Sequence, residues 1–191
     1  GLRALCDATG TLLIFDEVQT GVGRTGTFSM SDPLGATPDL IALAKSLGAG
    51  VPVSAVLVDD AVAAAVEPGD QGSTFGGGML AMAAVEATLR TLVEDDLMGR
   101  ATDIHTQVAE AVGPVVEEVR GRGCLMGLKL NRPAEPVIDA LRDQNVLVGG
   151  SSDPHVMRLM PPLVVSDDDV TAFAEALHAA LDATSAPARA H

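Results

Sequence analysis

Short apolar runs separated by glycine-containing polar segments fill the first eighty residues of the chain. Runs of this length, apolar at nearly every position, are typical of strands that are covered on both faces of a parallel or mixed sheet. The segment 59–66 is expected to be a short helix. This part of the sequence therefore predicts a piece of an α/β sheet domain. The predicted strands are Leu12–Phe15, Leu40–Leu43 and Val53–Val58.

Longer helices are expected from Met79 on. The alanine-rich segment 79–93 contains few helix-breaking residues and predicts a long helix. A second helix is expected at 101–120, where apolar residues share one face, and Pro114 should kink or split it. Ser166 precedes three aspartates and should cap the last helix, 168–183, because acidic side chains are favourable near a helix N-terminus. Shorter elements are expected in between: strands at 124–130, 146–148 and 156–159, and a helix at 134–144.

These elements divide the chain into three parts. Residues 1–78 are expected to form part of a large sheet domain, 79–100 a connecting helix, and 101–191 a smaller α+β domain. The chain begins with Gly1 rather than methionine, and its first strong element follows within about a dozen residues. We therefore expect it to be a piece of a longer protein.

The amino-acid composition and net charge of the chain argue against several classes of function. Apolar residues make up 47% of the 191 residues, and 26 acidic against 12 basic residues give a net charge of −14. Such a chain can bury a core but would repel a nucleic-acid backbone. No apolar run approaches the roughly 20 residues that cross a bilayer. Cys6 and Cys124 match no metal-ligand spacing and fit a reducing compartment. We expect a soluble, cytoplasmic protein with no metal, nucleic acid or membrane partner.

Chemically useful residues lie where the predicted strands end. Asp16 follows the first apolar run, and Lys45, one of only two lysines, follows the second. A glycine-rich loop, Gly72–Gly78, lies beyond Lys45 and contains the hydroxyls of Ser73 and Thr74. The carboxyl ends of parallel strands meet at one edge of a sheet, where α/β proteins bind ligands. An amine, a carboxylate and an anion-binding loop could therefore form one site.

These groups are the parts that hold pyridoxal 5′-phosphate (PLP). A lysine can form a Schiff base with the cofactor's aldehyde, and burial of Lys45 beside a glycine-rich turn would favour its unprotonated amine. Asp16 would hold the proton on the pyridine nitrogen, and the loop would bind phosphate together with the next helix. Each feature also has an ordinary interpretation, as a surface lysine, an acid that begins a loop, or a turn.

For two further charged residues, Arg158 and Glu17, the sequence allows two interpretations each. Arg158 lies in an otherwise apolar strand and could be an edge residue whose side chain reaches solvent, or a buried fork that binds a carboxylate. Glu17, directly after Asp16, could be a solvated neighbour or an ion-pair partner of Arg24. No catalytic role is assigned to Glu17.

Four segments that contain these residues closely resemble motifs of the class III aminotransferases, and most of all those of the acetylornithine aminotransferase group. They occur in the family's order with compatible spacing. The resemblance extends from about Leu2 to Ala183 but covers only the second half of a family member. The segments are Phe15–Gly26, Pro38-Asp39 leading to Ala44-Lys45, Gly72–Gly77 and Arg158–Leu163.

The resemblance implies a fold and a set of residue roles. The fold is α/β: a partial fold-type-I PLP aminotransferase, with part of the large mixed-sheet domain and the C-terminal α+β domain. Lys45 would form the Schiff base with PLP and later move the proton between substrate and cofactor carbons. Further roles are implied for six residues: Asp16 at the pyridinium nitrogen, Val18 on a ring face, Gln19 at the phenolic oxygen, Ser73 and Thr74 at the phosphate, and Arg158 at the substrate α-carboxylate.

The implied activity is PLP-dependent transamination of N-acetylornithine with 2-oxoglutarate, a step of arginine biosynthesis. In this family the residue that Thr74 matches comes from the partner subunit, which implies a homodimer with shared active sites. Another class III ω-aminotransferase, acting on ornithine, succinylornithine, 4-aminobutyrate or a diamine, is an alternative. A catalytically silent truncated product that needs a separate N-terminal half is a second one.

Two departures from the family pattern stand out. Met79 occupies a place where the family usually has proline, and losing that proline should loosen the start of the following helix. The family's N-terminal phosphate loop, the aromatic residue on the other ring face and the second substrate arginine are not found in this sequence. The chain alone is therefore expected to bind PLP poorly and to show no turnover.

Overall fold

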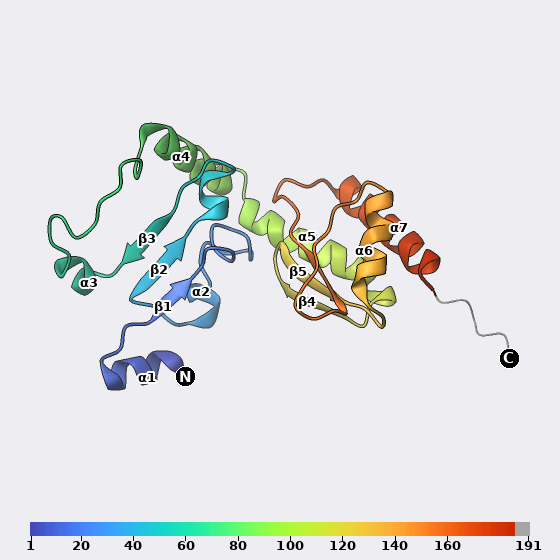
Figure 1. Ribbon diagram of the computed structural model, residues 1–191, viewed down its shortest axis with the longest axis horizontal. Helices are drawn as coiled ribbons and strands as arrows, with labels where there is room; N and C mark the ends of the chain where they lie inside the picture. Colours follow the sequence, from blue (N-terminus) through green and yellow to red (C-terminus); the bar gives the residue numbers. More distant parts are fainter. Residues whose placement is uncertain (186–191) are drawn as a thin grey trace. The chain divides into compact units, whose positions relative to one another are not determined.

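A three-stranded mixed sheet organises the first of two compact units, residues Gly1–Met98 (Figure 1). The computed structural model describes residues 1–185. Strand β1 (Ile14–Asp16) pairs in parallel with β2 (Leu40–Leu43), and β3 (Ala55–Val58) pairs antiparallel with β2. The bounds of β2 are those predicted from its apolar run, whereas β1 and β3 begin two residues later than predicted. The mixed sheet expected from continuous apolar strands is confirmed.

Helices surround this sheet. The predicted short helix and the long alanine-rich helix are confirmed, and Asp59 caps the short one by accepting a hydrogen bond from the Val62 N–H at 2.7 Å. The other three helical elements of this unit were not predicted from the sequence. The five helical elements of this unit are α1 (Leu2–Thr9), α2 (Ser31–Leu34), the 3-10 helix η1 (Lys45–Gly48), α3 (Asp60–Ala64) and α4 (Met79–Glu94).

An ion pair ties α1 to the amino ends of β1 and β2. Arg3 Nη1 lies 2.8 Å from Asp39 Oδ2, and the same oxygen accepts the Leu13 N–H at 2.6 Å. The Leu13 N–H first, and the Arg3 guanidinium second, hold the pKa of the Asp39 carboxyl below its usual range. Asp39 is therefore favoured as a carboxylate in the folded chain.

This arrangement makes the first unit sensitive to acid. A carboxyl whose folded-state pKa is lowered stabilises the fold above its unfolded pKa, and this stabilisation is lost as pH falls through the folded value. We expect Asp39→Asn to lower the thermal midpoint at about pH 6, by a difference from wild type that shrinks as the pH falls below the ordinary pKa of an aspartate. Asp7→Asn, at the exposed second partner of Arg3, is the control and should change the midpoint little throughout this pH range. A difference in thermal midpoint between wild type and Asp39→Asn that stays constant as the pH is lowered would contradict the stabilising role of the Asp39 carboxylate.

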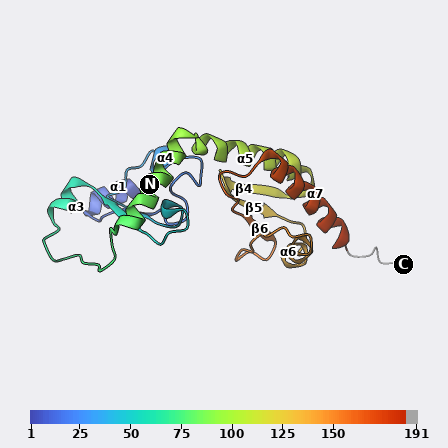
Figure 2. The same cartoon turned by 90° about the horizontal axis from the view of Figure 1, so that it is seen from above.

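The second unit begins at Gly99 and contains an antiparallel sheet of order β4-β5-β6. Its strands are β4 (Glu118–Arg122), β5 (Leu125–Lys129) and β6 (Val156–Leu159). Figure 2 shows α5 (Leu97–Val112) and α7 (Asp167–Ala183) on the same side of this sheet, and α6 (Ala134–Asp143) contacts both α7 and β6. One continuous core of side chains from the three helices, β5 and β6 holds the unit together. Its centre is made of aliphatic residues, among them Ile104, Leu128, Leu141, Met157 and Leu177.

Two sequence predictions in this unit were wrong. The helix predicted at 101–120 ends at Val112, a single 3-10 turn follows at Gly113–Val115, and Glu118 then begins β4. Glycine and proline at 113–114 stop the helix, because proline lacks the backbone N–H and clashes with the preceding turn. The segment 146–148 is not a strand, since the backbone joins β6 only at Gly149, which exchanges two hydrogen bonds with Arg158.

The start of α7 agrees with the sequence. Ser166 caps the helix by accepting the Asp169 N–H, and the Asp169 carboxylate accepts the Ser166 N–H in return. The Ser166 hydroxyl and N–H hold the pKa of Asp169 below its usual range. None of the helices described, from residue 1 to 185, combines the length and apolar character that crossing a membrane requires.

Candidate active site

Two of the predicted site residues leave the same edge of the first sheet. In the parallel register Asp16 lies beside Ala42, and the Glu17 N–H extends the ladder by donating to the Ala42 carbonyl at 2.9 Å. Lys45 follows three residues after Ala42, as the first residue of η1. The carboxyl ends of β1 and β2 therefore present a carboxylate and an amine at one ligand-binding edge.

Lys45 has an unusual backbone and an available amine. Its φ is +42°, in the left-handed region that non-glycine residues rarely adopt, and such strain is concentrated at functional sites. No hydrogen-bond or ion-pair partner of its amine lies within residues 1–185, whereas the chain's other lysine, Lys129, pairs with Glu117 at 3.0 Å. The expected burial of Lys45 is wrong for this chain, because its side chain is exposed.

Asp16 is also exposed rather than enclosed. Its Oδ1 accepts the Val18 N–H at 3.1 Å, which turns the chain sharply after the strand. Val18 and Gln19 are half-buried and lie in this turn. The three residues that the sequence assigned to the cofactor ring thus lie within four positions around one turn, next to the β2 end that carries Lys45.

Glu17 differs from the sequence expectation. The reading of Glu17 as a solvated neighbour is wrong, since only 2% of the residue is exposed. Its carboxylate accepts hydrogen bonds from the Thr20 and Ser29 hydroxyls and from the Met30 N–H. The serine and threonine residues between positions 20 and 31 could have indicated this contact, because their hydroxyls can donate hydrogen bonds to a buried carboxylate.

Ser73 and Thr74 lie in the open segment between α3 and α4, which runs outside the sheet (Figure 1). The Ser73 hydroxyl accepts the Gly76 N–H at 2.9 Å, and Thr74 is exposed. Neither hydroxyl forms a hydrogen bond with Asp16 or Lys45. Within one chain, hydrogen bonds therefore do not connect these two hydroxyls to the site residues at the carboxyl ends of β1 and β2.

Arg158 belongs to the second unit and faces away from its core. Glycines flank it on both sides, with Gly127 beside it on β5 and Gly149 on the adjoining segment. A Cβ added to Gly149 would lie 3.4 Å from both Nε and Nη2 of Arg158, so glycine leaves room for the guanidinium. The side chain is exposed, and its guanidinium has no hydrogen-bond or ion-pair partner in the part of the chain described.

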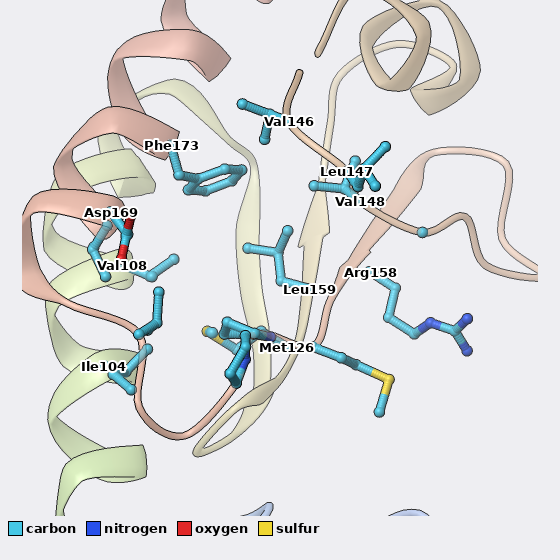
Figure 3. Close-up of a pocket in the computed structure, with 16 residues that line it drawn as sticks. Ile104, Val108, Met126, Val146, Leu147, Val148, Arg158, Leu159, Asp169 and Phe173 are labelled. Carbon is cyan, nitrogen blue, oxygen red and sulfur yellow. The ribbon is translucent and has the colours of Figure 1, made fainter. Parts of the chain in front are cut away.

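An apolar cavity of about 460 Å³ lies next to this strand. Figure 3 shows Phe173, Val108 and Ile104 on one side of Leu159, whereas the Arg158 side chain points to the other. The Arg158 guanidinium thus lies at the rim of the cavity, away from the apolar side chains that line it. Of the two interpretations of Arg158, the exposed side chain agrees with an edge residue that reaches solvent and not with a buried fork.

Comparison with known proteins identifies the family. The model of the aminotransferase class-III family matches residues 1–181, so the chain belongs to the class III aminotransferases, a PLP-dependent family. It is 44% identical over 191 residues to the acetylornithine aminotransferase of Mycobacterium tuberculosis, covering 97% of this chain and 48% of that protein. It is 42% identical over 176 residues to acetylornithine aminotransferase 1 of Bradyrhizobium diazoefficiens, covering 88% and 43%.

The solved structures that are similar to this chain are also aminotransferases. An amine transaminase from an uncultivated Pseudomonas species, in its PLP-bound form, superposes with a TM-score of 0.86 at 33% identity, over 96% of this chain and 47% of that one. The ornithine aminotransferase of Toxoplasma gondii superposes at 0.85 with 34% identity, over 94% and 45%. The predicted partial fold-type-I architecture is thereby confirmed. The chain spans about half the length of the relatives that it matches.

Proposed function

We propose that this chain supplies the C-terminal part of the active site of a PLP-dependent aminotransferase that acts on N-acetylornithine and 2-oxoglutarate. The observation that carries this proposal is the pairing of Asp16 and Lys45 at adjacent carboxyl ends of β1 and β2. The names of the most similar relatives support the choice of amino donor. Neither Cys6 nor Cys124 forms a disulfide within residues 1–185, which fits a cytoplasmic enzyme.

The residues at this edge fit the cofactor. PLP, when bound, supplies a protonated ring that withdraws electrons from the substrate's α-carbon. The Lys45 amine would hold the cofactor's aldehyde and then carry the proton to and from that carbon. Asp16 would keep the ring nitrogen protonated, because a carboxylate favours a neighbouring cation. Val18 would pack on the ring, and Gln19 would donate to its phenolic oxygen.

Other parts of the chain would contact the substrate and the phosphate of PLP. The Arg158 guanidinium would bind the α-carboxylate of the amino acid through paired hydrogen bonds. Ser73 and Thr74 would bind the phosphate of PLP, and Thr74 would do so in the site of a partner subunit, so the working enzyme would be a homodimer with shared sites. Their exposure, with no hydrogen bond to Asp16 or Lys45 of their own chain, is compatible with that arrangement.

A substrate screen of the whole enzyme tests the proposed donor. With 2-oxoglutarate as acceptor, we expect N-acetylornithine to give the highest kcat/KM among N-acetylornithine, ornithine, succinylornithine, 4-aminobutyrate and diamines. A higher value for one of the other donors would reassign the enzyme within the family. Turnover of none of them would overturn the proposed activity.

Arg158→Ala should mainly weaken substrate binding. Losing hydrogen bonds between charged groups is expected to raise KM for the amino acid about 10- to 100-fold, with a smaller change in kcat. Steady-state kinetics with both substrates measure the effect. Arg122→Ala, on the outer strand β4 of the same sheet, is the control and should leave KM unchanged. An unchanged KM for every amino-acid and keto-acid substrate in Arg158→Ala would refute this role.

One observation favours a second candidate function, that of a component which needs a separate N-terminal half. Both outer strands of the first sheet expose large apolar side chains, with Ile14 and Val56 each 59% exposed and Leu57 47% exposed. Neighbouring residues of a strand face opposite sides, so Val56 and Leu57 leave both faces uncovered. Co-expression with an N-terminal half of a relative should then restore PLP binding that the chain alone lacks. Strong PLP binding by the chain alone would exclude this candidate.

A further inference from the structure

Glu17 is the buried carboxylate of the first unit that the proposed chemistry does not use. Its Oε2 accepts the Thr20 hydroxyl at 2.6 Å, and its Oε1 accepts the Ser29 hydroxyl at 2.7 Å and the Met30 N–H at 2.6 Å. Every partner is a donor, and Ser29 is itself buried. The carboxylate is therefore the point at which a loop of more than ten residues closes onto the end of β1.

The backbone of Glu17 is held as firmly as its side chain. Its N–H donates to Ala42 of β2, and its carbonyl accepts the Gly21 N–H, both at 2.9 Å. A Cβ added to Gly21 would lie 2.8 Å from Leu43 Cδ2 and 2.9 Å from the Glu17 carbonyl oxygen, so only glycine permits this approach. Five hydrogen bonds thus fix one residue at the carboxyl edge of the sheet.

The loop that closes onto Glu17 is strained and packed. Val22 is buried and has a φ of +55°, a conformation that is costly for a β-branched residue and that surrounding contacts must enforce. Its N–H donates to the Phe28 carbonyl at 2.9 Å, which brings the two sides of the loop together before Ser29 and Met30 reach Glu17. The loop would lose its attachment to the strand without the Glu17 carboxylate.

We propose that Glu17 is a positioning residue for the cofactor-ring residues Asp16, Val18 and Gln19, an inference that rests on the proposed function. Neighbouring side chains of an extended segment point to opposite sides. The Glu17 side chain enters the protein while the Asp16 side chain remains exposed at the sheet edge. Fixing Glu17 therefore fixes the direction of its neighbours, and a small displacement of Asp16 would remove its carboxylate from the ring nitrogen.

Hydrogen bonding, and not charge, is the property that this role requires. In Glu17→Gln the remaining oxygen can still accept from Ser29 and Met30, and the Thr20 hydroxyl can rotate to accept from the new amide. In Glu17→Ala the Met30 N–H and the Thr20 and Ser29 hydroxyls lose the carboxylate as acceptor in a part-buried place, and the Ser29 hydroxyl keeps only its contact with Ser31. Glutamine should therefore rescue most of what alanine removes.

PLP affinity of the whole enzyme tests the proposal. We expect Glu17→Ala to raise the dissociation constant of PLP about 10- to 100-fold, and Glu17→Gln to stay within about threefold of wild type. In the same protein without PLP, amide hydrogen exchange of residues 18–30 should be faster in Glu17→Ala only. Asp39→Ala is the matched control, because it removes a hydrogen-bonded carboxylate at the opposite ends of the same strands and should leave PLP affinity near wild type.

Each outcome is decisive. Wild-type PLP affinity in Glu17→Ala, an equal loss of affinity in Asp39→Ala, or a loss in Glu17→Gln as large as in Glu17→Ala would overturn the positioning role alone. Wild-type enzyme that takes up no PLP would overturn the proposed function and this inference together. If Glu17→Ala does not fold, Ser29→Ala removes a single donor and should still raise the dissociation constant several-fold, and an unchanged value there would also overturn the role.

Discussion

Lys45→Ala in the whole enzyme is expected to lower kcat for transamination by at least about 10,000-fold, the scale of loss seen when a covalent catalytic group is removed. The reason is that the same amine would both hold the cofactor and transfer the substrate proton. Its side chain is exposed at the sheet edge and its amine has no partner in the described chain, so the loss should not come from unfolding. Steady-state rates and thermal midpoints of the variant measure the two effects separately.

Lys129→Ala is the control for this experiment. Lys129 is the only other lysine and is engaged with Glu117 on the second sheet, so its removal should leave turnover near wild type. Exposed ion pairs contribute little to stability, and the fold should tolerate the change. Turnover by Lys45→Ala within about tenfold of wild type, or loss of turnover in Lys129→Ala instead, would show that the wrong amine has been assigned.

Asp16→Asn should have the second-largest effect, a fall in kcat of about 100-fold or more. The amide has the shape of the carboxylate and can still accept the Val18 N–H, but it carries no charge to keep the ring nitrogen protonated. KM for the amino acid should change little, because the proposed carboxylate contact is made by Arg158. Rates over a range of amino-acid concentrations separate these two constants.

Asp32→Asn provides the control for Asp16. Asp32 is an exposed acid on α2, within the same unit, and its neutralisation changes the net charge by the same amount. If Asp32→Asn lowers kcat as much as Asp16→Asn does, the effect is one of overall charge and the role at the ring nitrogen is refuted. Full activity of Asp16→Asn would refute it as well.

The sequence predicted the elements that position the site, and it failed where tertiary context decides. The apolar run Leu40–Leu43 gave the bounds of β2, the central strand of the first sheet, because an apolar residue at every position is typical of such a strand. The segment 146–148 is equally apolar but is not a strand, since only Gly149 reaches β6. Gly113 and Pro114 end α5, although the helical spacing of apolar residues continues beyond them.

Burial around the candidate site could not be predicted from this sequence. The apolar run before Lys45 and the glycines after it suggested an enclosed amine, yet the side chain is exposed, as is that of Asp16. Glu17 is the opposite case, because the sequence left a solvated acid or an ion-pair partner of Arg24 open, and the residue is buried. Its burial depends on Ser29 and Met30, more than ten positions away, and adjacency in sequence gives no sign of that contact.

Reductive trapping of the PLP-loaded enzyme with borohydride, followed by peptide mass spectrometry, identifies the amine that holds the cofactor. We expect a stable pyridoxyl group on the peptide that contains Lys45 and none on the peptide that contains Lys129. A pyridoxyl group on Lys129, or on neither lysine of these 191 residues, would contradict this assignment.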